Sequence, residues 1–252
     1  MRLDIEVLRI FAAFMVVWFH ANMHLDLTVP DIAPPFFAGV AGYFAALSKS
    51  PLIGKIKTVF MAYVFWALIY SVLTYLVQGK PMLRVDQMLL APVIHLWFLP
   101  FVAMVYVFAK FSGVWVSFAV LLAAVFGIHS GVEMPAPYAQ YLNSLPCAMV
   151  GIIIAKWEGP KIPIALTLAV AVGLTGLGNA IAAAMLLPLC FSGFKGDIRK
   201  FSGLMLGVYL IHPLALFVGV RLLDGFYIVI FAFIASVVAV AILKKTPLRF
   251  AV

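Results

Sequence analysis

The feature that most constrains the fold of this chain is a succession of apolar runs of helical length, which continues from one end to the other. Of the 252 residues, 66% are apolar and 10% are charged, and the mean hydropathy is +1.17. A soluble domain of this size could not stay in solution with that composition. The runs lack the alternation of outer-membrane barrel strands, so the spans are expected to be helices. We therefore expect an all-α, polytopic membrane bundle surrounded by lipids.

Glycine, proline and charged residues interrupt the runs and set the expected helix boundaries. Within the second helix, Gly39 and Gly42 should permit close approach of a neighbouring helix. The chain is expected to form a single domain over residues 1–252. The expected helices cover residues 4–24, 36–47, 53–77, 95–110, 114–128, 138–157, an interrupted stretch at 163–194, then 201–220 and 226–243.

The stretch 163–194 decides the number of spans. One helix there would be ~45 Å long against a hydrocarbon core of ~30 Å, whereas two would be ~20 Å each. The positive-inside rule separates these alternatives. With ten spans and both termini in the cytoplasm, all of the 17 Lys and Arg residues except Lys80, Arg84 and Arg221 lie inside. We therefore expect about ten transmembrane helices, divided near Gly176 and Gly178.

The net charge of +8 does not indicate nucleic acid, because the basic residues lie at helix ends and act as topology signals. Cys147 and Cys190 fall inside apolar runs, which favours buried packing over a disulfide. His20 and His24 have the i, i+4 spacing of metal ligands, but no HExxH-type pattern accompanies them, so no metal is expected.

The first helix carries two polar residues that are costly in an apolar segment. Arg9 and His20 are eleven residues apart, so both lie on nearly the same face with ~16 Å between their backbones. Ionisable groups at membrane depth usually line a path or a site. Burial favours the neutral imidazole of His20, which can act as a general base or nucleophile. Two simpler interpretations stay open: an ion pair of Arg9 with Glu6, and a packed His20 bonded to a neighbouring helix.

On the ten-span topology all five histidines lie toward the outer side: His20, His24, His95, His129 and His212. For His129 taken alone, a tolerated polar residue at the membrane interface is the simpler interpretation.

Several motifs resemble those of membrane acyltransferase family 3, the sugar O-acyltransferases of bacterial envelopes. Arg9 and His20, with ten residues between them, match the Arg-x10-His motif of that family's first helix. Residues 35–44 are similar to its Phe-rich second helix, and residues 56–66 to its basic loop and third helix. The segment His-Leu-Trp-Phe-Leu at 95–99 and the segment Gly-Val-Tyr-Leu-Ile-His-Pro at 207–213 resemble two further signatures in the same order.

The resemblance implies a multi-pass enzyme of the bacterial inner membrane. It transfers an acyl group, usually acetyl from cytoplasmic acetyl-CoA, to a hydroxyl of an envelope glycan or lipid-linked sugar. His20 would be the general base or the acyl carrier, with Arg9 as the second catalytic residue. The cations placed for the donor phosphates are Arg9, Lys55 and Lys57, and the residues expected at the acceptor are His95, Trp97, Tyr209 and His212.

A transporter or flippase for a sugar or lipid is the alternative from another functional class. About ten helices, a glycine-broken helix pair, and intramembrane His and Arg would also suit a substrate path.

Overall fold

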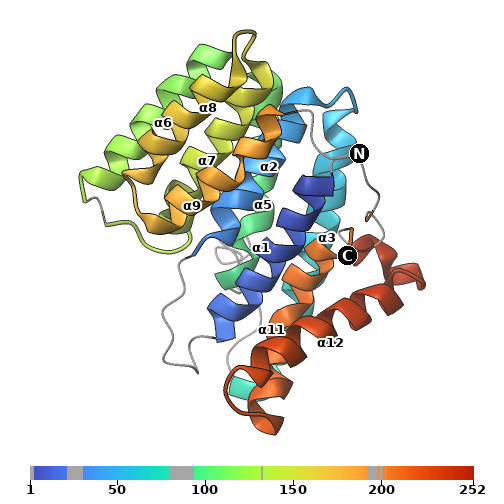
Figure 1. Ribbon diagram of the computed structural model, residues 1–252. Helices are drawn as coiled ribbons and strands as arrows, with labels where there is room; N and C mark the ends of the chain where they lie inside the picture. Colours follow the sequence, from blue (N-terminus) through green and yellow to red (C-terminus); the bar gives the residue numbers. More distant parts are fainter. Residues whose placement is uncertain are drawn as a thin grey trace. The chain divides into compact units, whose positions relative to one another are not determined.

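Figure 1 shows the computed structural model of the chain, in which every segment of regular structure is a helix. The structure describes residues 3–21, 31–79, 94–131, 133–191, 198, 201 and 203–252, and these contain ten α-helices and no strand. The α-helices are α1 (Leu3–Ala21), α2 (Ala33–Leu47), α3 (Leu52–Gln78), α5 (Phe98–Phe111), α6 (Val114–His129), α7 (Tyr138–Lys156), α8 (Lys161–Gly173), α9 (Leu177–Met185), α11 (Met205–Leu222) and α12 (Tyr227–Leu243). Three short 3-10 helices are η2 (Ile94–Trp97), η3 (Leu187–Cys190) and η4 (Pro247–Ala251). The all-α fold class is thus confirmed.

Three of these helices are long and apolar enough to cross a membrane: Leu52–Val77, Tyr138–Lys156 and Met205–Leu222. Shorter helices also present apolar side chains outward. On α6, Trp115, Leu122 and Phe126 are 72%, 63% and 75% exposed, a stripe that water would not favour. A membrane bundle therefore suits these helices, while the total of about ten spans and the cytoplasmic location of both termini stay predictions.

The helix boundaries follow the breakers in the sequence. Helix α3 ends at Gly79, whose φ of 63° is the left-handed conformation that glycine adopts easily, and its N–H donates to the Tyr75 carbonyl at 2.9 Å. The stretch 163–194 is divided as expected: α8 ends at Gly173, the chain turns through Gly176 with φ 140°, and α9 begins at Leu177. The first helix is described as far as Ala21, so His24 lies outside the described residues.

The described helices fall into two compact units. Unit 1 combines both ends of the chain and contains α1, α8, α9, α11 and α12, while unit 2 contains most of α2 and all of α3, η2 and α5 to α7. In unit 1, α1 packs against α11 and α12, which also pack against each other, and α8 pairs with α9. In unit 2, α3 packs against α5 and α6 packs against α7.

An aromatic cluster joins α1 to α12 inside unit 1. The rings of Phe14 and Phe233 meet edge to face at 5.4 Å between centroids, and those of Trp18 and Phe226 at 5.2 Å. Edge-to-face contacts of this kind add to the apolar burial. They fix the helix that carries Arg9 and His20.

Glycines bring α2 and α7 into backbone contact inside unit 2. A Cβ added at Gly151 would lie 1.9 Å from the Gly39 carbonyl oxygen, and one added at Gly42 would lie 2.5 Å from the Ala148 oxygen. Real Cβ atoms do not approach that closely. The close helix approach expected at Gly39 and Gly42 is therefore confirmed, with α7 as the partner.

Candidate active site

Two histidines from opposite ends of the chain meet in unit 1. His20, near the end of α1, and His212, in the middle of α11, have ring centroids 4.8 Å apart and planes inclined by 62°. Each belongs to a separate motif of the sequence, and the packing of α1 on α11 brings the two together. A paired imidazole site is therefore the centre of the candidate active site.

Pro213 explains the orientation of the His212 ring. Proline has no N–H, so the carbonyl four residues earlier, that of Tyr209, loses its usual helical donor. The His212 ring takes that place, with its Nδ1 2.7 Å from the Tyr209 oxygen. A carbonyl only accepts hydrogen bonds, so Nδ1 carries the proton. In the neutral ring, Nε2 then carries the lone pair.

His20 has the same tautomer by a different route. Its Nδ1 lies 2.9 Å from the carbonyl oxygen of Val16, one turn earlier on α1, and therefore donates to it. The Nε2 atom of the neutral His20 ring is thus the basic and nucleophilic nitrogen. Both functions that the sequence analysis left open for His20, general base and acyl carrier, need that atom.

The two rings differ in their access to solvent or membrane. His212 is completely buried, with the buried ring of Tyr209 6.1 Å away. His20 is only partly buried and also contacts the ring of Phe19 at 5.5 Å. Two positive charges at the separation of this pair would repel each other. Because His212 is completely buried and His20 only partly, His20 is the more accessible ring of the pair.

Arg9 forms the ion pair considered in the sequence analysis. Its Nη1 donates to the two carboxylate oxygens of Glu6 at 3.1 and 3.4 Å. The Glu6 side chain is 7% exposed and that of Arg9 31%. Beyond α12, burial and the nearby Arg9 guanidinium lower the pKa of Lys244, whose ammonium donates to the Gly203 carbonyl. Because ~16 Å of helix separates the backbones of Arg9 and His20, only an extended ligand can meet both.

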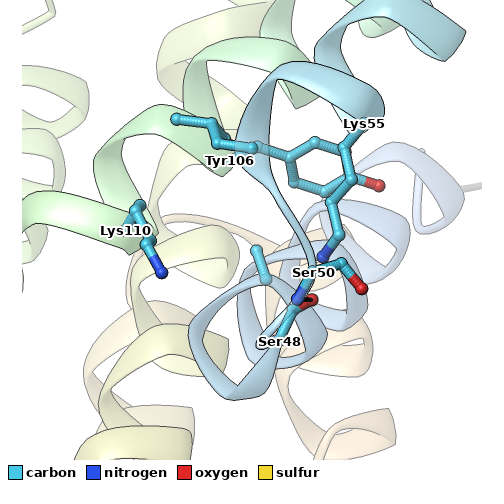
Figure 2. Close-up of a pocket in the computed structure, with 7 residues that line it drawn as sticks. Ser48, Ser50, Lys55, Tyr106 and Lys110 are labelled. Atoms are coloured by element: carbon cyan, nitrogen blue, oxygen red, sulfur yellow. Dashed lines mark hydrogen bonds between the residues drawn. The ribbon is translucent and has the colours of Figure 1, made fainter.

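The lysines expected at the donor lie in unit 2 and differ from each other. Lys55 lines a pocket together with Ser48, Ser50, Tyr106 and Lys110, as Figure 2 shows. Lys57 is exposed and does not line that pocket. The structure thus selects Lys55 as the more enclosed of the two cations.

Trp97 is a core residue of unit 2. It is 6% exposed, and its ring packs against those of Phe101 and Tyr141 at 5.9 and 5.7 Å. A sugar can stack on this indole only after one of its faces is uncovered. The backbone of His95 forms part of η2, but the structure does not describe the His95 side chain. Of the two expected acceptor residues in unit 1, His212 contacts the His20 ring, and Tyr209 lies beside His212.

Sequence reasoning missed two parts of these sites. It did not connect Lys110 with Lys55, because they lie on separate helices and no spacing rule joins them, and it did not include Ser48 and Ser50 of the segment between α2 and α3. It also gave no role to Pro213, which lies inside α11. The signal was available in the order His-Pro, since a proline always frees the carbonyl four residues before it.

The described residues contain no group of three or more His, Cys, Asp or Glu side chains that could hold a metal ion. No family model, curated protein or solved structure matches the chain.

Proposed function

We propose that this chain is an O-acyltransferase of the bacterial inner membrane. It moves an acyl group, most simply acetyl, from cytoplasmic acyl-CoA to a hydroxyl of an envelope glycan or lipid-linked sugar. The observation that carries the proposal is the contact between His20 and His212 at 4.8 Å. The two rings belong to two separate motifs that resemble the same acyltransferase family, and such a meeting is expected if both motifs serve one site.

In the general-base route, Nε2 of His20 accepts the proton of the acceptor hydroxyl. The hydroxyl oxygen attacks the thioester carbonyl, a carbon–oxygen bond forms, and the carbon–sulfur bond breaks. The imidazolium then returns its proton to the departing thiolate, so the ring ends as it began. The Nδ1–H bond to the Val16 carbonyl holds the ring in the tautomer that this route needs.

In the acyl-carrier route, Nε2 of His20 attacks the thioester itself and an acyl-imidazole forms as the thiolate leaves. The acceptor hydroxyl then attacks this acyl group, a carbon–oxygen bond forms and the carbon–nitrogen bond breaks. The hydroxyl proton goes to the released Nε2 of His20, which passes it to the thiolate of CoA, so the ring ends as it began. Trapping an acyl group on His20 by rapid quenching and mass spectrometry separates the two routes.

The donor is proposed to meet the cations, and the acceptor the aromatic and imidazole groups. Arg9, Lys55 and Lys57 are proposed for the phosphates of acyl-CoA, since guanidinium and ammonium groups suit phosphate oxygens. His95, Trp97, Tyr209 and His212 are proposed for the acceptor sugar. The contact of His212 with His20 supports its place there most directly.

The test is acyl transfer by purified protein in nanodiscs, supplied with acetyl-CoA labelled in the acetyl group and with envelope glycans. Free CoA and labelled glycan are both measured. The variant His20→Ala should reduce transfer by ~10²-fold or more, the size of a lost general acid–base group. His129→Ala is the matched control, because His129 is an exposed histidine at the end of α6 in the other unit. Equal transfer by the wild type and His20→Ala would refute the proposal.

The same preparation tests the transporter alternative. A flippase would move labelled sugar or lipid across a vesicle without consuming acetyl-CoA. Movement without acetylation, reduced in His20→Ala, would replace the acyltransferase proposal by the transport one. Acetylation that is lost in His20→Ala would exclude the transport alternative.

A further inference from the structure

The pocket of Lys55 lies where several helices of unit 2 begin or end. Ser48 and Ser50 follow the end of α2, Lys55 is in the first turn of α3, and Tyr106 and Lys110 come from the last part of α5. Figure 2 shows these side chains around one hollow. The hollow itself is small, about 10 Å³, and is partly open to solvent, so a ligand would be held at its open side.

Positive charge gathers at this pocket. The Lys55 ammonium lies 5.4 Å from the centre of the Tyr106 ring, a cation–π contact that holds it in place. Lys110 is close enough to repel both Lys55 and Lys156, whose ammonium donates to the Ser112 carbonyl. Within the part of the chain that the structure describes, none of these three lysines forms an ion pair with a carboxylate. An ion pair within these residues therefore does not neutralise the positive charge of the cluster, and an anion would find it favourable.

The two serines add uncharged donors. The Ser48 hydroxyl oxygen accepts the backbone N–H of Ser50 at 3.2 Å, so its own proton is available to donate elsewhere. Ser50 brings a second, exposed hydroxyl to the pocket. Two ammonium groups and two hydroxyls form a set of donors, and phosphate oxygens are acceptors that suit such a set.

Aromatic residues mark the same end of unit 2. Trp115, at the start of α6, contacts Trp157, which follows the end of α7, with ring centroids 6.3 Å apart. Lys156, the last residue of α7, donates a hydrogen bond to the carbonyl of Ser112, which lies just before α6. Tryptophans in membrane proteins concentrate at headgroup level, and basic pockets between helices at that level bind anionic headgroups.

We propose that Ser48, Ser50, Lys55 and Lys110 form a binding site for a phosphate group, carried by a membrane phospholipid or by a soluble phosphate ester. The site goes beyond the proposed acyl transfer and does not depend on it, although Lys55 is also one of the cations expected at the acyl donor. Lys110 and the two serines have no part in the proposed acyl transfer.

The first experiment measures thermal unfolding of the full chain in a neutral detergent while inorganic phosphate is titrated against sodium chloride of equal ionic strength. Phosphate should stabilise the wild type. Lys110→Gln should weaken the apparent affinity about tenfold, the effect of one lost charge-assisted hydrogen bond. Lys49→Gln removes the same charge from an exposed lysine between the two serines that does not line the pocket, and should change the affinity less than about twofold.

The second experiment identifies the source of the phosphate. Native mass spectrometry compares protein from nanodiscs of phosphatidylcholine alone with protein from nanodiscs that also contain phosphatidylglycerol. Retained phosphatidylglycerol that is lost in Lys110→Gln supports a lipid headgroup. Stabilisation by free phosphate without lipid retention supports a soluble ester.

The proposal fails if neither phosphate nor phosphatidylglycerol binds, or if Lys49→Gln weakens binding as much as Lys110→Gln. Lys110→Arg, which keeps the charge, should retain binding and so separates loss of the site from loss of the fold. Binding is measured without acyl donor and should persist in His20→Ala. Failure of this site is therefore distinguishable from failure of acyl transfer.

Discussion

The sharpest prediction concerns Pro213, which orients the buried histidine of the candidate active site. Pro213→Ala restores a backbone N–H that can donate to the Tyr209 carbonyl. In the wild type, Nδ1 of His212 is the donor to that carbonyl oxygen, at 2.7 Å. An interior proline costs a helix about 3 kcal/mol relative to alanine. The weakened His212 bond offsets about 1 kcal/mol of that gain. We therefore expect Pro213→Ala to raise the free energy of unfolding by up to ~2 kcal/mol.

Activity should move in the opposite direction. The His212 ring, no longer alone at the Tyr209 carbonyl, should spend less time in the required tautomer and orientation, so acyl transfer should fall about five- to tenfold. Pro146→Ala is the control, because Pro146 is a buried proline inside α7 with no part in the proposed site. It should stabilise the protein without changing transfer. Unchanged transfer in Pro213→Ala, or an equal loss in Pro146→Ala, would refute the reasoning.

Three further predictions concern packing and charge. Gly151→Ala should destabilise the fold by about 1–3 kcal/mol, because the added methyl group clashes with α2. Gly54→Ala, in open space on α3, should stabilise the fold by about 0.5–1 kcal/mol. Thermal unfolding of both variants checks this, and similar changes in the unfolding temperature of both would contradict the contact between α2 and α7. Burial raises the pKa of Asp31 from 3.8 to about 6, so the folded state holds the proton more tightly and should lose stability as pH rises from about 4 to 6, by at most ~3 kcal/mol. Asp31→Asn should remove that pH dependence and be more stable than the wild type at pH 7. A variant less stable than the wild type at pH 7 would show that the ionised Asp31 carboxylate stabilises the fold, contrary to this prediction. Arg9→Ala should destabilise the protein by about 1–3 kcal/mol by leaving the Glu6 carboxylate unpaired, and should weaken acetyl-CoA binding more than acceptor binding; if Glu6→Gln with Arg9→Ala restores both, Arg9 serves only the ion pair.

The helices were predictable because their boundaries depend on local chemistry. Gly79 ends α3 through its own left-handed conformation, and Gly176 divides the apolar stretch between α8 and α9. Neither event needs a tertiary partner. The number of helices that cross the membrane is less predictable, since it depends on the bilayer as well as on the chain. By length and hydropathy alone, α3, α7 and α11 are the described helices that could span a membrane.

The site was only partly predictable, because its contacts join distant parts of the sequence. The motifs around His20 and His212 were visible separately, but their contact depends on the packing of α1 against α11. The meeting of Lys55 with Lys110 likewise depends on α3 lying against α5. Helix periodicity identifies which face of a helix is apolar, but it does not identify the helix that covers that face.

The two histidines differ in the way their Nδ1 atoms are held, and this difference bears on the proposed acyl transfer. The Val16 carbonyl that His20 bonds is in the helical interior of α1 and also serves the backbone, whereas the Tyr209 carbonyl that His212 bonds has been freed by Pro213. The His212 ring is therefore held more firmly, and it is also the completely buried one. The shared carbonyl leaves the partly exposed His20 ring freer to move. In the proposed acyl transfer, the ring that accepts a proton or an acyl group has to follow the reacting atoms, so this freedom favours His20 over the fixed His212 for that role.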